Sequence, residues 1–135
     1  MESQLTKDSS PKEVRIAWVA ALRSKTYTQG KERLRIRDEY CCLGVLCDLA
    51  VKAGVIGPPI NTDHEIEVFV YGADRCTLPW QVQEWAALTS PNGAYGMRQG
   101  LAQDNDNGKT FEDIANTILR RQPDLFYGLY EKEDE

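Results

Sequence analysis

Apolar positions near the start of the chain recur with the period of an α-helix. The string Ser10-Pro11-Lys12-Glu13 offers a capping serine, a first-turn proline and a glutamate three residues after the cap. The apolar residues behind it are spaced three and four apart: Val14, Ala17, Trp18, Ala21 and Leu22. This pattern predicts an amphipathic helix over residues 11–24.

Residues 41–53 are apolar on nearly every side. Their two charged residues, Asp48 and Lys52, are four apart and can pair on one helical turn. Gly54 is a typical helix end. A helix without a polar face belongs in the middle of a domain, and Gly44, which costs about 1 kcal/mol of helix propensity, indicates close packing against a neighbour.

Two further helices and two strands complete the predicted fold. The helices span residues 79–88 and the segment from the capping box at Thr110 to Pro123. Alternation in Arg33-Leu34-Arg35-Ile36-Arg37 predicts a strand with the arginines on its outer face, and residues 66–71 predict another that turns back into a partner at 75–77. The fold class is therefore α+β: about four helices around a central apolar helix, with a small antiparallel sheet.

Length and composition limit the class of protein. A chain of 135 residues predicts a single domain over 1–135, and we expect a frayed N-terminus at about 1–9 and an acidic C-terminal tail at about 124–135. No apolar run approaches the roughly 20 residues of a membrane span, and the polar start has no signal-peptide core. We expect a cytoplasmic protein with no membrane contact.

The net charge of −5 is divided unevenly: residues 1–37 sum to +5 and residues 38–135 to −10. An acidic balance argues against general binding of duplex DNA, which needs lysine and arginine to neutralise phosphates. A local basic ridge could still hold a small anion or meet an acidic partner.

The cysteines allow two interpretations. Cys41 and Cys42 stand where a strand meets a helix N-terminus, a position that can activate a thiol nucleophile, and His64 could serve as its base. The order of cysteine and histidine is that of papain-like and cell-wall peptidases. The alternative is that cysteine packs as a small hydrophobe in a buried helix, which an all-apolar helix favours. Cys42 and Cys47 cannot bridge within one helix, so we expect free thiols in a reducing compartment.

The sequence gives limited support to metal, cofactor, calcium and phosphate sites. With one histidine and no CxxC pair we expect no metal, and no string typical of a nucleotide loop or hydrolase occurs, so we expect no cofactor. Residues 104–108 fail both registers of a calcium loop and predict a polar turn that could contact a ligand. The arginines at 33, 35 and 37 could grip phosphate or simply charge a strand edge. Among the tryptophans, Trp18 and Trp85 lie on apolar stripes, and Trp80 is expected to be partly exposed.

Three strings carry a family resemblance. They are Tyr40-Cys41-Cys42-Leu43-Gly44-Val45-Leu46-Cys47-Asp48-Leu49-Ala50; Leu78-Pro79 with Val82-Gln83-Glu84-Trp85; and Leu101-Ala102 and Asn105-Asp106-Asn107-Gly108 with Phe111-Glu112-Asp113-Ile114-Ala115. With them the chain resembles a family of small phage and prophage proteins, from the first helix to about residue 120. Asp104 departs from the leucine expected before Asn-Asp, which would loosen that loop. The resemblance implies a phage protein acting in the bacterial cytoplasm, and it carries over no activity, catalytic residue or cofactor.

These observations lead to a primary hypothesis and two alternatives. The primary one is a non-enzymatic binding protein that binds a host protein or sequesters a nucleotide signal, as proteins of the counter-defence class do. For an anionic or nucleotide ligand the expected contacts are Arg33, Arg35, Asn105 and Asp106. One alternative is a thiol hydrolase that uses Cys41 or Cys42 with His64. The other is an assembly protein, which predicts a large exposed apolar face and a symmetric oligomer.

Overall fold

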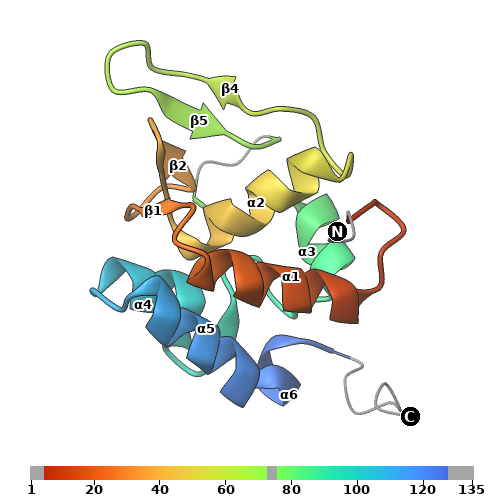
Figure 1. The fold of residues 1–135 in the computed structure, drawn as a ribbon. Coiled ribbons are helices and arrows are strands. Elements are labelled where there is room, and N and C mark those ends of the chain that lie inside the picture. The colour runs from red at the N-terminus through yellow and green to blue at the C-terminus, as the bar shows by residue number, and fades with distance from the viewer. Residues whose placement is uncertain (1–4, 73–75, 128–135) are drawn as a thin grey trace.

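The computed structural model describes residues 5–72 and 76–127, which form a mixed α/β fold (Figure 1). Within these residues there are six helices, against about four expected, and two sheets. The helices are α1 (Pro11–Arg23), α2 (Cys42–Lys52), α3 (Trp80–Ala86), α4 (Leu101–Asp106), α5 (Phe111–Arg120) and α6 (Gln122–Leu125). The strands are β1 (Thr28–Gln29), β2 (Arg35–Ile36), β3 (Glu39–Tyr40), β4 (Ile60–Asn61), β5 (Val68–Val70), β6 (Ala94–Gly96) and β7 (Gln99–Gly100).

The larger sheet has the order β1-β3-β2-β5-β4 and is not purely antiparallel, because β1 pairs with β3 in parallel. Both predicted strands are shorter than expected. Arg37 and Glu67 have positive φ values of 53° and 58°, and such left-handed residues interrupt the extended backbone. The strand β5 pairs with β2 and β4. Of the partner strand expected at 75–77, residue 75 lies outside the described residues, and Cys76 and Thr77 form a bend instead of a strand.

Local sequence explains where the helices begin. The capping boxes of α1 and α5 form as predicted, with Ser10 and Thr110 accepting from the backbone of Glu13 and Asp113. The expectation of a polar turn over 104–108 is wrong in its first half, because α4 continues to Asp106. The buried side chain of Leu101 anchors that helix, so tertiary packing outweighs the turn preference of asparagine and aspartate.

Helix α2 packs against α1, α3 and α4, and in Figure 1 it runs between the larger sheet and α1. Seven consecutive residues, 41–47, are buried. A Cβ atom on Gly44 would stand 1.8 Å from the carbonyl oxygen of Leu34. The glycine predicted to permit close packing therefore lets α2 touch the backbone that leads into β2.

The described chain ends extend the core further than expected. The tail expected over 124–135 includes Leu125 and Phe126, which are buried, and Phe126 meets Trp18 edge to face at 6.5 Å. At the other end, inside the range expected to fray, the carbonyl of Thr6 accepts from Trp85 Nε1 at 3.0 Å. Among the described residues, no helix is both long and apolar enough to cross a bilayer.

Candidate functional site

The twin thiols lie inside the molecule. Cys41 caps α2, with its Sγ accepting from Gly44 N–H at 3.4 Å, and Cys42 Sγ–H donates to the carbonyl of Leu101 at 3.5 Å. Burial raises the pKa of Cys41 to about 11 and also raises the pKa of Cys42. Both thiols are therefore protonated at neutral pH, a state in which they are poor nucleophiles.

The predicted base lies elsewhere. His64 is exposed in the β4–β5 turn, where the Asp63 carboxylate accepts from the N–H groups of Glu65 and Ile66. In Figure 1 this turn stands at the outer end of the hairpin, well away from the N-terminus of α2. The structure thus does not place the His64 turn beside the buried thiols of Cys41 and Cys42.

The three arginines do not form a row on one outer face. The Arg35 guanidinium lies over the rings of Phe69 and Tyr40, at 4.0 and 5.1 Å from their centroids, and its Nε donates to the carbonyl of Arg37. Arg37 has left the strand and donates to the carbonyl of Glu65 at 2.7 Å. Since β2 is only two residues long, the alternation that predicted a shared face is lost. Arg33 precedes the strand and donates to the carbonyl of Glu32 at 3.2 Å.

Asn105 and Asp106 do approach the segment that precedes β2, but through internal hydrogen bonds. Asn105 is fully buried; its Oδ1 accepts from Cys42 N–H at 3.1 Å and Gln29 Nε2 at 2.9 Å, and its Nδ2 donates to Gly30 at 2.7 Å. Asp106 accepts from Glu32 N–H at 2.7 Å. The exposed amide expected at Asn105 is therefore absent: this side chain joins the start of α2 to the segment around Gly30.

An exposed aromatic surface lies on α3. As predicted, Trp18 and Trp85 are buried, whereas the Trp80 side chain is 68% exposed. We call the residues around it the α3 surface: Lys7, Val55, Trp80, Gln81, Gln83, Glu84, Trp85 and Tyr127. Trp80 and Glu84 are one helical turn apart and line both of its hollows.

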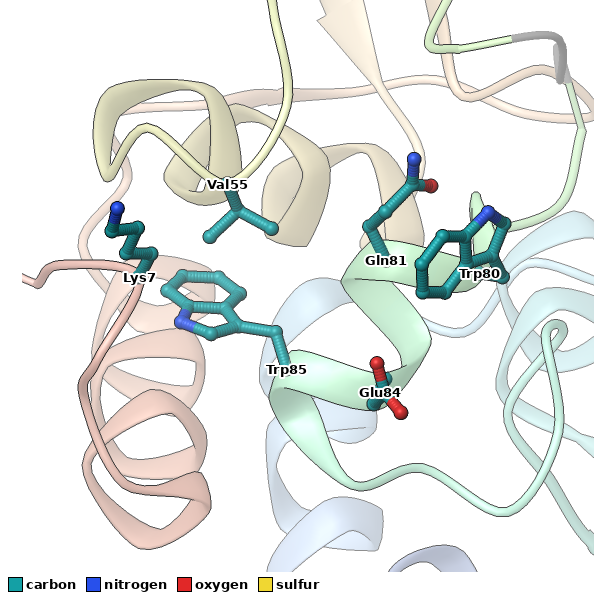
Figure 2. A pocket seen from close by; sticks show the side chains of 6 residues that line it. All are labelled: Lys7, Val55, Trp80, Gln81, Glu84 and Trp85. Atoms are coloured by element: carbon teal, nitrogen blue, oxygen red, sulfur yellow. The ribbon is translucent and has the colours of Figure 1, made fainter.

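The first hollow is about 330 Å³ in volume and is shown in Figure 2. Trp85 and Val55 face one another there, while Trp80 stands at the other end of α3. Lys7 lies beyond Trp85 in the same view, held near α3 by the bond from Trp85 Nε1 to the preceding residue. The walls of this hollow are thus mainly apolar, with one polar side chain, Gln81, and one charge of each sign, Lys7 and Glu84.

The second hollow, of about 230 Å³, is completed by Tyr127. Helix α3 ends at Ala87 in the left-handed conformation, with φ of 60°. The next residue, Leu88, forms a bridge with Phe126, and Tyr127 N–H donates to the carbonyl of Ala87 at 3.1 Å. These contacts place the half-exposed ring of Tyr127 beside α3.

Sequence reasoning found one member of this surface and missed others. Trp80 lies off the apolar stripe of its helix, and this signal predicted its exposure. Tyr127 was assigned to the tail, although the apolar pair Leu125-Phe126 before it was a sign of packing. Nothing in the sequence places Lys7 or Val55 beside α3, because their positions depend on tertiary contacts.

Comparison with known proteins gives a family but no activity. A family model described as Domain of unknown function (DUF8296) matches residues 11–122. No curated protein and no solved structure gives a significant match. The region matched covers all of α1 to α5, and with them most of the α3 surface.

Proposed function

The chain belongs to this family of unknown function, and we propose that it is a non-enzymatic binding protein that contacts a protein partner through the α3 surface. The observation that carries the proposal is the exposure of Trp80 between two hollows. Tryptophan and tyrosine dominate the energetic hot spots of protein interfaces, because they bury a large area at a low cost in conformational entropy.

The chemistry of the surface indicates what the partner presents. An arginine or lysine from the partner could lie on the face of Trp80 and pair with the carboxylate of Glu84, one turn along α3. Apolar groups on either side of that cation would fill the two hollows. The acidic balance of residues 38–135 would favour the approach of a basic partner surface.

Protein binding is better supported than a thiol hydrolase or a nucleotide site. A thiol hydrolase needs an accessible thiolate, but Cys41 and Cys42 are buried with raised pKa values. A nucleotide site at Arg33, Arg35, Asn105 and Asp106 would compete with the internal hydrogen bonds of the last three. The resemblance to phage and prophage proteins supports a phage-encoded protein whose partner is a host protein, for instance a component of a defence system.

The test is affinity capture from bacterial lysate with matched surface variants. We expect the wild-type protein to retain a specific host protein that Trp80→Ala and Glu84→Gln both lose. Met97→Ala is the control, because Met97 is exposed outside the α3 surface, at the turn between β6 and β7. Capture that is unchanged by Trp80→Ala would contradict the proposal.

A further inference from the structure

A second cavity lies among α4, α5 and the β6–β7 hairpin and shares no residue with the α3 surface. Its volume is about 420 Å³, within the range of small-ligand sites. All eight side chains that line it are polar or charged. Its charged side chains are Asp104, Lys109, Asp113 and Arg120.

The two carboxylates of the cavity already have donors. Asp104 Oδ2 accepts from the hydroxyl of Tyr95 at 2.6 Å, so the residue that departs from the expected leucine is held in place. Asp113 Oδ2 accepts from the N–H of Thr110 at 3.1 Å in the capping box of α5. These bonds spread part of each negative charge over the protein's own donors.

The two cations of the cavity are less fully engaged: the charge of Lys109 only adds to the Thr110 hydrogen bonds that lower the pKa of Asp113. Within the described part of the chain, neither Lys109 nor Arg120 forms an ion pair; the Arg120 guanidinium makes one long hydrogen bond, 3.4 Å to Thr117 Oγ1. The neighbouring Arg121 differs, since it pairs with Asp124 at 3.0 Å and lies over the Tyr95 ring at 5.0 Å. Lys109 and Arg120 therefore retain donors for an anion from outside.

From this arrangement we propose that the cavity binds a small sugar phosphate. The guanidinium of Arg120 and the ammonium of Lys109 would hold the phosphate, because both groups suit charge-assisted hydrogen bonds to phosphate oxygens. Sugar hydroxyls would bind the carboxylate of Asp104 and the Nδ2 of Asn116, whose Oδ1 already accepts from Arg23 Nη2. A nucleobase fits less well, because the Arg121 guanidinium already lies over the ring of Tyr95, the only aromatic residue lining this cavity.

At short range the charges of the cavity balance, because two cations and two carboxylates line it. Residues 38–135 carry an excess of ten negative charges, which would weaken the long-range attraction of any anion. At physiological salt such fields are screened beyond about 8 Å, so direct contacts decide the affinity. Binding of an anion in this cavity would therefore depend on the unused donors of Lys109 and Arg120, and not on an excess of positive charge.

The test is isothermal titration calorimetry at fixed ionic strength with glucose 6-phosphate, ribose 5-phosphate, inorganic phosphate and glucose. We expect a sugar phosphate to bind at least about tenfold more tightly than inorganic phosphate, and glucose not to bind. Arg120→Gln and Lys109→Gln should each weaken binding by about tenfold, the effect of losing about 1.4 kcal/mol of a charge-assisted contact. Arg98→Gln, at an exposed residue in the β6–β7 turn outside the cavity, should leave the affinity unchanged.

Two results would overturn the proposal. One is the absence of heat with both sugar phosphates at millimolar concentration. The other is equal affinity in wild type, Arg120→Gln and Lys109→Gln, which would indicate binding elsewhere. Urea unfolding of each variant verifies that it is folded, and the two substitutions on different segments give independent tests. The outcome does not depend on the α3 surface, so it is separable from the protein-binding proposal.

Discussion

The starts of α2 and α3 differ in solvent exposure: the cysteines at the start of α2 are buried, and the tryptophan at the start of α3 is exposed. At the start of α2 the two thiols of Cys41 and Cys42 are enclosed, and burial raises the pKa of both. At the start of α3 the indole of Trp80 is left largely in solvent beside two hollows. The two cysteines that suggested a catalytic thiol are thus part of the core, whereas Trp80, which has no catalytic group, is exposed to solvent.

Neighbouring segments explain this difference. Around the start of α2, Leu34 approaches Gly44 and Asn105 binds the Cys42 N–H, so two other parts of the chain pack against the turn that holds the thiols. Around the start of α3, the described contacts leave Trp80 without such packing, and the buried residues of that helix are Val82, Trp85 and Ala86. Predictions that change the enclosure of α2 or the exposure of α3 test this comparison.

The largest effect is expected from Gly44→Ala. Its added Cβ would lie 1.8 Å from a backbone oxygen, so α2 or the segment at Leu34 must shift. We expect the free energy of unfolding to fall by about 4 kcal/mol, which is at the upper end for single substitutions. Urea unfolding of the variant and of wild type measures this difference in the free energy of unfolding.

Gly57→Ala is the matched control for that substitution. A Cβ there would meet no atom within 4 Å, so stability should be unchanged or rise slightly. Equal stability of Gly44→Ala and wild type would show that α2 is not held against Leu34 as described.

The next largest loss of stability is expected at Asn105, the buried amide that binds the start of α2. Asn105→Ala removes three internal hydrogen bonds and leaves the Cys42 N–H and the Gly30 carbonyl without their partner. We expect a loss of about 3 kcal/mol, because buried polar groups without partners retain their desolvation cost. Thermal or urea unfolding of Asn105→Ala, beside the exposed Asn107→Ala, gives the difference; a loss of equal size in the two variants would contradict the assigned role.

A smaller effect is expected from pH. Because the folded state raises the pKa of Cys41 from an ordinary value near 9 to about 11, folding is favoured by the protonated thiol. That contribution is complete below about pH 9 and is lost as the pH rises toward 11, on the order of 2 kcal/mol for this thiol. Urea unfolding at pH 7, 9, 10 and 11 should show the decline.

Cys41→Ser is the matched variant for the alkaline series, since serine keeps a capping oxygen and does not ionise in this range. Its stability should decline less steeply than that of wild type. Parallel curves would mean that the Cys41 thiol is not shielded in the folded protein.

The smallest effect on stability is expected from Trp80→Ala. The side chain is mostly in water, so the free energy of unfolding should change by less than about 0.5 kcal/mol. Loss of the captured partner without loss of stability would separate binding from folding at this position. A loss above about 1 kcal/mol would instead show that Trp80 packs as part of the core.

Features of the fold that depend on residues close together in the sequence could be predicted, whereas those that depend on distant residues could not. The capping boxes at Ser10 and Thr110 and the packing role of Gly44 follow from local spacing, and the structure confirms them. The strands at β1, β4 and β7 are two residues long, too short for alternation to signal.

The candidate sites were harder to predict for the same reason. The sequence marks Asn105 as polar and therefore exposed, but a buried asparagine is favourable once distant donors and acceptors surround it. The alternation of arginines predicts one shared face, but Arg37 has a positive φ, which ends the extended backbone before the alternation is complete. The exposure of Trp80 was predictable from its place off the apolar stripe, whereas Tyr127 and the hollows depend on how α3 meets the segment after α6.

The claim that the thiols belong to the interior is tested most directly by counting reactive cysteines in the folded protein. Titration with 5,5′-dithiobis(2-nitrobenzoate) at pH 7 without denaturant should show one rapidly reacting thiol, the exposed Cys76, with the buried Cys41, Cys42 and Cys47 reacting only as the protein unfolds. A second fast thiol that disappears in Cys41→Ser or Cys42→Ser would contradict the account and restore the thiol-enzyme hypothesis.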